Sequence, residues 1–177
     1  MDSVLRLIRR KAAFVYPVPP APSTAVLAPW FRSRGGVRVF AHGWDAGAAA
    51  YRPAAIAATW DQLEPLLALR IDSLTHAVIV LARSGNELLT IERRQQLWRA
   101  FRVPVFEQII GANGTLLAAE CEAHAGLHIE WSKLESSKLE VAGLPIERWP
   151  CGCGRSTPRV RALGHIEEIR AVAAYSR

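Results

Sequence analysis

The chain has 177 residues, half of them hydrophobic, so it can bury one core and is short for two domains. No apolar run reaches the roughly 18 to 20 residues of a transmembrane helix, and the first residues lack a secretory-signal pattern. We therefore expect a cytoplasmic protein without a transmembrane segment. Its expected organisation is an N-terminal extension over residues 1–34 and a single α/β domain over residues 35–177.

Net charge makes nucleic acid a partner to consider. Lys and Arg total 22 against 16 Asp and Glu, a formal net charge of +6, and a basic surface attracts phosphate backbones. However, the basic residues are scattered except near the two ends, and no nucleic-acid-binding motif accompanies them. Nucleic acid therefore stays an alternative that rests on charge alone.

The first 34 residues combine two patterns. Residues 3–14, SVLRLIRRKAAF, predict a short amphipathic docking helix, with membrane-surface binding as the alternative. Residues 16–29 hold five prolines, which remove amide donors and favour extended backbone. We expect this second segment to be a linker or a strap over the domain surface, with the folded part beginning near Gly35.

The folded part shows alternating strand and helix signals. Residues 37–42, VRVFAH, alternate like a strand, and residues 53–69 carry apolar residues at helical spacing, with a break or a second helix at Pro65. Residues 75–83, THAVIVLAR, are typical of a strand that is covered on both faces.

A βαβ unit follows. Residues 90–101 predict a helix that directs Ile91, Leu97, Trp98 and Phe101 inward, and residues 103–110, VPVFEQII, predict a strand parallel to the one before it. Residues 115–122 and 126–131 then predict a short antiparallel hairpin, and residues 166–175 a helical tail.

Cys121, Cys151 and Cys153 are the only cysteines. In a cytoplasmic protein a stable disulfide is disfavoured, so a metal is the better explanation for them. Three thiolates and one imidazole make a closed tetrahedral zinc site whose role is structural. The glycines of Cys151-Gly-Cys153-Gly relieve backbone crowding and let both thiolates reach one ion.

The hairpin suggests the fourth ligand. If its turn centres on residues 124 and 125, Cys121 lies opposite His128, with Cβ atoms about 5 Å apart on one face. His128 is therefore the expected ligand, while His124 is a rival because Cys-x-x-His is a workable spacing. Glu120 and Glu130 are candidates to orient His128. The expected fold class is α/β, with a mixed sheet in which a βαβ unit precedes an antiparallel hairpin and a zinc-stabilised loop.

These residues also carry a family likeness. AECEAHAGLHI at 119–129 and PCGCGRSTPRV at 150–160 resemble the "EC…GLHI" strand pair and the "PCPCGRTHPRI" loop of phenylacetate-CoA ligases and related adenylate-forming enzymes. RRQQLWRAFRVPVF at 93–106 resembles the helix and strand that precede their active-site loop. The likeness covers roughly residues 70–165. It implies that Cys121, His128, Cys151 and Cys153 match positions that can hold zinc.

The departures from that family concern its chemistry. After the VPVF-like strand those enzymes place a Tyr-Gly-x-Thr-Glu type motif, whereas residues 107–117 here are EQIIGANGTLL. Their Arg-x-Arg-Asp segment would precede Pro150, where the sequence is GLPIERW. The 177 residues also contain neither their Ser/Thr/Gly-rich phosphate loop nor their catalytic-lysine domain. Adenylation needs phosphate clamping and metal-assisted charge stabilisation, so we expect a relative without the ligase chemistry.

Three hypotheses follow. The first is a non-catalytic zinc-containing α/β domain that binds a protein partner or a small acyl or nucleotide ligand, with no catalytic or cofactor-binding residues. The second is an accessory subunit of an acyl-activating, ATP-dependent ligase system, and the third is a nucleic-acid-binding zinc protein. Acid–base chemistry by His42, Asp45 and His76 is a poorer alternative, because lone histidines in apolar surroundings are more often structural.

Overall fold

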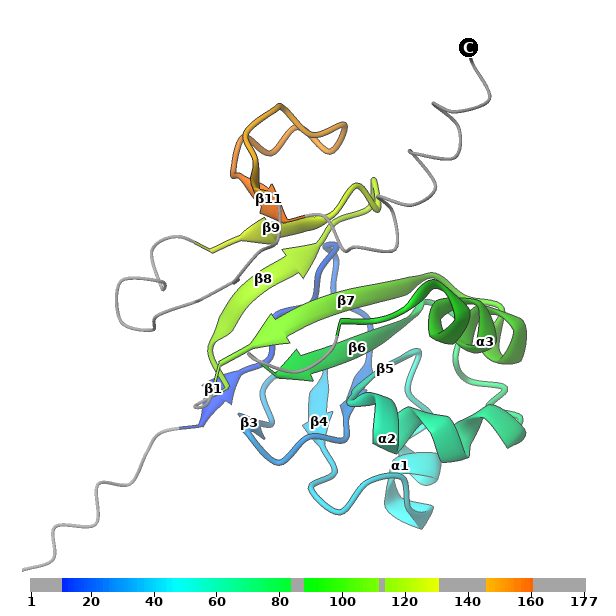
Figure 1. Cartoon of the computed structure of the whole chain (residues 1–177). Coiled ribbons are helices and arrows are strands. Elements are labelled where there is room, and N and C mark those ends of the chain that lie inside the picture. Colours follow the sequence, from blue (N-terminus) through cyan, green and yellow to red (C-terminus); the bar gives the residue numbers. More distant parts are fainter. Residues whose placement is uncertain (1–10, 84–87, 112–113, 131–145, 161–177) are drawn as a thin grey trace, which may run out of the picture.

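The structure is a computed structural model that describes residues 11–83, 88–111, 114–130 and 146–160 (Figure 1). A nine-stranded mixed sheet has the strand order β10-β11-β9-β8-β7-β6-β5-β2-β4, so the expected α/β class with a mixed sheet is confirmed. Its strands are β2 (Thr24–Val26), β4 (Val37–Val39), β5 (Ala55–Ala58), β6 (Ala77–Arg83), β7 (Val105–Ile110), β8 (Leu116–Glu120), β9 (Leu127–Ile129), β10 (Ile146–Glu147) and β11 (Arg159–Val160). A separate small sheet pairs β1 (Ala12–Ala13) with β3 (Phe31–Arg32).

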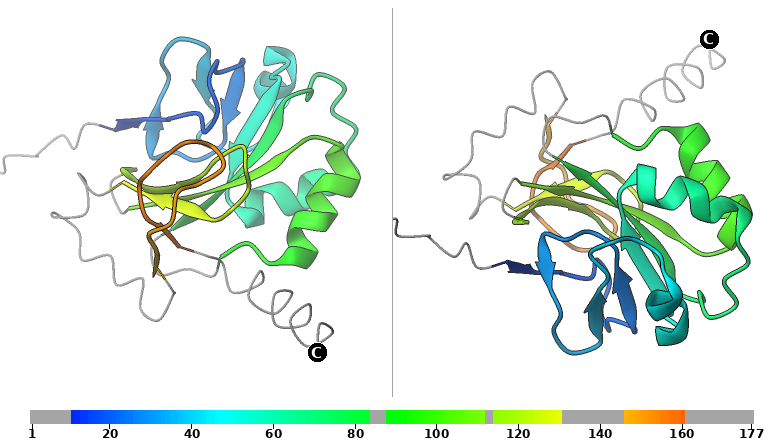
Figure 2. Two further views of the ribbon diagram at one scale, coloured as in Figure 1. Left: turned by 90° about the horizontal axis from the view of Figure 1, so that it is seen from above. Right: turned by 90° about the horizontal axis from the view of Figure 1, so that it is seen from below.

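The sheet has a parallel half and an antiparallel half. Strands β4, β2, β5, β6 and β7 are parallel, and β8, β9, β11 and β10 continue in antiparallel pairs. Helices α2 (Trp60–Leu63) and α3 (Ile91–Phe101) cover one face (Figure 2). That face packs Ile56, Val78 and Val80 against Leu63 and Leu97.

The opposite face is covered by the N-terminal segment. Ala57, Ile79 and Leu81 belong to a core cluster that also contains Phe14 and Phe31. The two phenylalanine rings meet edge to face, with centroids 5.6 Å apart. Both faces of the central strands are therefore buried, which explains why β6 has a continuous apolar sequence.

The βαβ unit is confirmed: β6 and β7 are parallel neighbours and α3 connects them. Thr90 caps α3 by accepting the Arg93 N–H at 3.3 Å. Leu97 is fully buried as expected, but Trp98 is 52% exposed, so its inward placement was wrong. Adjacent helical positions are about 100° apart, so the two side chains leave α3 in different directions.

Residues 53–69 are not the helix that their spacing predicts. They form β5, then α2, then a 3₁₀ helix at Glu64–Ala68. The alanine-rich segment becomes a strand because β2 and β6 pair with its two edges, a tertiary effect that overrides local propensity. Pro65 lies in the first turn of the 3₁₀ helix, where a second segment was expected.

The prediction of a linker or surface strap is wrong for residues 24–26. These residues form the fully buried strand β2, which lies between β4 and β5. Strand β2 precedes the expected boundary at residue 34, and β4 and β5 follow it, yet all three strands belong to one sheet. Ala12–Ala13 is a strand rather than the end of a helix. The rest of the expected N-terminal helix, residues 3–10, and the expected tail at 166–175 lie outside the described residues. No helix within the described ranges is long and apolar enough to cross a membrane.

The first helix in the chain, α1 (Ala46–Tyr51), begins after Asp45. The Asp45 carboxylate accepts the N–H of Ala48 at 2.8 Å, so it is a helix cap. His76 Nδ1 lies 2.9 Å from the Thr75 hydroxyl oxygen. Both residues therefore have local partners that account for them without acid–base chemistry.

Candidate metal centre

Four side chains from three segments meet at the end of the β8–β9 hairpin. Cys121 follows β8, His128 lies in β9, and Cys151 and Cys153 lie in the loop between β10 and β11. One ligand atom from each residue lies within 4.8 Å of the other three. All are buried except Cys153, which is partly exposed. These are the four residues that the sequence selected.

The hairpin register differs from the expected one. His128 pairs with Ala119, and Leu127 with Glu120, so Cys121 does not lie directly opposite His128. Strand β8 ends at Glu120, two residues earlier than expected, and the turn that follows it contains His124 and Gly126 with positive φ angles of 47° and 112°. A shift of two residues keeps each side chain on its face of a sheet, so both ligand atoms still reach the cluster.

A tight turn brings the other two thiols together. The Gly154 N–H donates to the Cys151 carbonyl at 2.9 Å, and Gly154 has a φ of 80°, in the left-handed region that favours glycine. Strand β11 then pairs with β9, with Arg159 opposite His128. The cysteine loop is thereby fixed beside the hairpin.

Two separations between ligand atoms fit one tetrahedral ion. Cys121 Sγ lies 3.7 Å from Cys151 Sγ, and Cys153 Sγ lies 3.4 Å from His128 Nε2. Tetrahedral bonds of about 2.3 Å to sulfur and about 2.0 Å to nitrogen imply separations of about 3.8 Å between sulfurs and about 3.5 Å between sulfur and nitrogen. All three cysteines are free. The residues therefore fit a metal ion that is bound by three sulfurs and one nitrogen.

Thr157 orients the histidine. His128 Nδ1 lies 2.9 Å from the Thr157 hydroxyl oxygen and 3.2 Å from its carbonyl oxygen, which leaves Nε2 for the cluster. Burial lowers the pKa of His128, and the nearby Arg155 and Arg159 lower it further, so the neutral, metal-binding imidazole is favoured. Thr157 occupies the orienting role for which the sequence offered Glu120 and Glu130 as candidates.

The thiols have unequal environments. Burial raises the pKa of Cys121 to about 12, and the neighbouring Cys153 and Cys151 thiols add to the rise. At Cys151 burial also opposes ionisation, but the Cys153 N–H, the neighbouring thiols and Arg159 outweigh it and lower the pKa. A bound cation would stabilise thiolates at all three positions.

The rival ligand His124 lies outside this cluster. Its ring stacks on Phe106 with centroids 4.8 Å apart, and its Nδ1 lies 3.4 Å from Glu120 Oε1. The other oxygen of Glu120 accepts the Glu107 N–H at 2.9 Å and an Arg94 N–H at 3.0 Å. Glu120 therefore ties the hairpin to α3 and β7.

No family model and no curated protein matches this sequence. The structure is similar to the crystal structure of an open conformation of 2-hydroxyisobutyryl-CoA ligase in complex with 2-HIB-AMP and CoA, with a TM-score of 0.56 and 12% identity. The match covers 82% of this chain and 45% of that chain. This chain shares the fold of part of an acyl-CoA ligase. It spans less than half of that enzyme's length, and at this identity the likeness concerns the fold alone.

Proposed function

We propose that Cys121, His128, Cys151 and Cys153 bind a structural zinc ion in a non-catalytic α/β domain that serves as a binding or accessory protein. The observation that carries this proposal is the convergence of three sulfurs and one imidazole nitrogen within 4.8 Å of one another, with two of the separations at tetrahedral spacing. Thiolate and imidazole ligands in this geometry favour zinc, and four protein ligands leave no open position for a substrate.

The ion has a clear structural task. Strand β9 has three residues, and β10 and β11 have two each, which is short for independent stability. One ion would link the end of β8, β9 and the loop before β11. Removing it with a strong chelator should lower the melting temperature of the full chain, and added Zn²⁺, but not Mg²⁺, should restore it. An unchanged melting temperature after verified metal removal would contradict a structural ion.

The non-catalytic part of the proposal rests on the β7–β8 connection. Where the ligase family has its Tyr-Gly-x-Thr-Glu type motif, this chain has a short hairpin in which the Gly111 N–H donates to the Thr115 carbonyl at 2.8 Å. We expect no pyrophosphate release from ATP with a carboxylic acid and CoA. ATP-dependent release by purified protein, abolished by substitutions in this chain, would refute the non-catalytic role.

The likeness to a ligase in complex with 2-HIB-AMP and CoA supports a small acyl or nucleotide ligand as one candidate occupant. A protein partner is the other. The second candidate function is an accessory subunit of an acyl-activating system, favoured by the likeness of this fold to part of an acyl-CoA ligase. Co-purification with a synthetase chain would support this function, and recovery of the protein alone from its own cells would count against it.

A further inference from the structure

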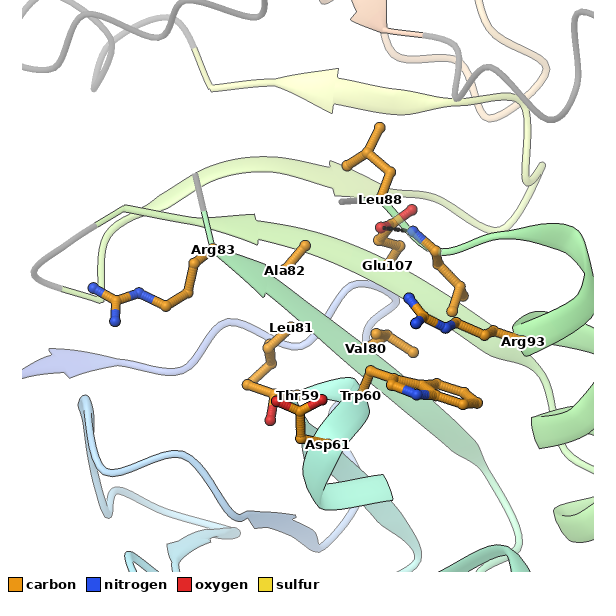
Figure 3. Close-up of a pocket in the computed structure, with 11 residues that line it drawn as sticks. Thr59, Trp60, Asp61, Val80, Leu81, Ala82, Arg83, Leu88, Arg93 and Glu107 are labelled. Carbon is orange, nitrogen blue, oxygen red and sulfur yellow. Dashed lines mark hydrogen bonds between the residues drawn. The ribbon is translucent and has the colours of Figure 1, made fainter. Parts of the chain in front are cut away.

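A cavity of about 460 Å³ lies on the helix-covered side of the sheet, at the carboxyl end of β6 (Figure 3). Residues 59–61, 80–83, 88–89 and 93 line it together with Glu107 of β7, and none of the four cluster residues does. The volume is typical of small-molecule sites. The carboxyl ends of parallel strands are a common place for ligands in open α/β sheets.

Glu107 is the feature of this cavity that needs an explanation. Glu107 is only 1% exposed, and its Oε1 atom accepts the Leu89 N–H at 2.6 Å. Within the described part of the chain Glu107 forms no ion pair, because Arg94 pairs with Glu120. Burial raises its pKa to about 7, and the negative Glu120 adds to the rise while Arg94 opposes it. A buried carboxylate with one hydrogen bond lacks the partners that such a group needs.

The other residues that line the cavity restrict which ligand could bind to Glu107. Val80, Leu88 and Leu89 supply the apolar part of the lining, and Thr59 and Asp61 add a hydroxyl and a second carboxylate. Two arginines also border the cavity, but their guanidinium groups lie over aromatic rings, Arg83 over Trp30 at 5.2 Å and Arg93 over Trp60 at 4.9 Å. The cavity thus offers a buried carboxylate beside an apolar surface.

We infer that this cavity binds a small organic amine whose ammonium group donates to Glu107 and whose short aliphatic chain packs on Val80, Leu88 and Leu89. The inference rests on the binding role within the proposed function and does not depend on the metal. The proposed ligand is a cation, whereas an ionised carboxylic acid is an anion.

Three probes of equal chain length test it. Ligand-observed NMR titrations of the full chain with butylamine, butanol and butyrate would be made in amine-free buffer at about pH 8, where Glu107 ionises. We expect butylamine to bind most tightly and Glu107→Gln to weaken it about tenfold, the loss of one charge-assisted hydrogen bond. Leu88→Trp, which fills the cavity and leaves the carboxylate, should weaken it too.

Asp72→Asn is the matched control, since it removes an exposed carboxylate paired with Arg70 and should leave binding unchanged. Circular dichroism and metal content of each variant separate loss of binding from loss of fold. Equal butylamine binding by wild type and Glu107→Gln would overturn the inference, and so would binding of no probe. Tighter binding of butyrate would also overturn it while supporting the acyl ligand. A metal-free but amine-binding protein would instead contradict only the zinc proposal.

Discussion

Cys153 Sγ lies 3.4 Å from the Nε2 atom of His128, and the other nitrogen of that ring faces Thr157. The same imidazole is thus turned toward a thiol on one side and fixed by a hydroxyl oxygen on the other. Groups that hold a ligating histidine through its second nitrogen set its tautomer and ring orientation. Thr157 therefore belongs to the candidate metal centre although it contributes no ligand.

The role of Thr157 gives the first prediction. Thr157→Val removes the 2.9 Å contact to Nδ1 and should weaken zinc binding about tenfold, the lower end of the effect of such partners. Thr157→Ser keeps a hydroxyl and should bind zinc nearly as tightly as wild type. Competition with a chromophoric chelator measures both. Equal affinity of the valine and serine variants would show that the hydroxyl does not matter.

The two candidate histidines can be separated directly. His128→Ala removes the nitrogen at the cluster and should cost the protein its bound metal, whereas His124→Ala removes a ring that stacks on Phe106 and should leave about one metal per chain. Elemental analysis of both variants checks this. Metal loss from the His124 variant alone would reverse the assignment.

The sequence predicted the elements whose signals are local. The apolar run of β6 and the Thr90 cap with buried Leu97 in α3 each carry their own pattern. Strands β2 and β5 could not be predicted in this way, because their state depends on ladder partners that are distant in sequence. Alanine-rich Ala55–Ala58 favours a helix until β2 and β6 pair with it.

The candidate site could be predicted because cysteines and histidines are few. The register of the β8–β9 hairpin could not be predicted, because side chains alternate between the two faces of a sheet. Registers that differ by two residues therefore put Cys121 and His128 on the same face. Turn geometry decides between those registers, and it depends on His124 adopting a positive φ. Glu107 left a signal that was overlooked: a carboxylate inside the apolar strand VFEQII.

The Arg94–Glu120 pair should stabilise the attachment of α3 to the hairpin. Arg94→Met leaves the 4%-exposed Glu120 side chain without its cation and should lower the free energy of unfolding by about 2 kcal/mol. Arg70→Met breaks an exposed pair with Asp72, which solvent screens, and should change the free energy of unfolding much less than Arg94→Met does. Urea unfolding of the metal-loaded protein measures the difference. Similar effects in both variants would contradict the structural role of the buried pair.

Glu107 predicts a pH dependence. Its pKa is raised from 4.5 to about 7 in the folded protein, so between these values the native state binds more protons than the unfolded state, and the stability that Glu107 contributes falls as pH rises. Glu107→Gln cannot titrate. In amine-free buffer its stability relative to wild type should therefore increase from about pH 5 to about pH 8, by at most about 3 kcal/mol. A constant difference across that range would contradict the raised pKa.

Metal content of the full chain is the most direct test of the zinc proposal. The protein would be purified without added zinc or chelator and analysed for elements, beside Cys151→Ser. We expect about one zinc per chain in wild type, and both less zinc and a lower melting temperature in the variant. Wild-type protein that is metal-free and still folded would contradict the structural zinc ion.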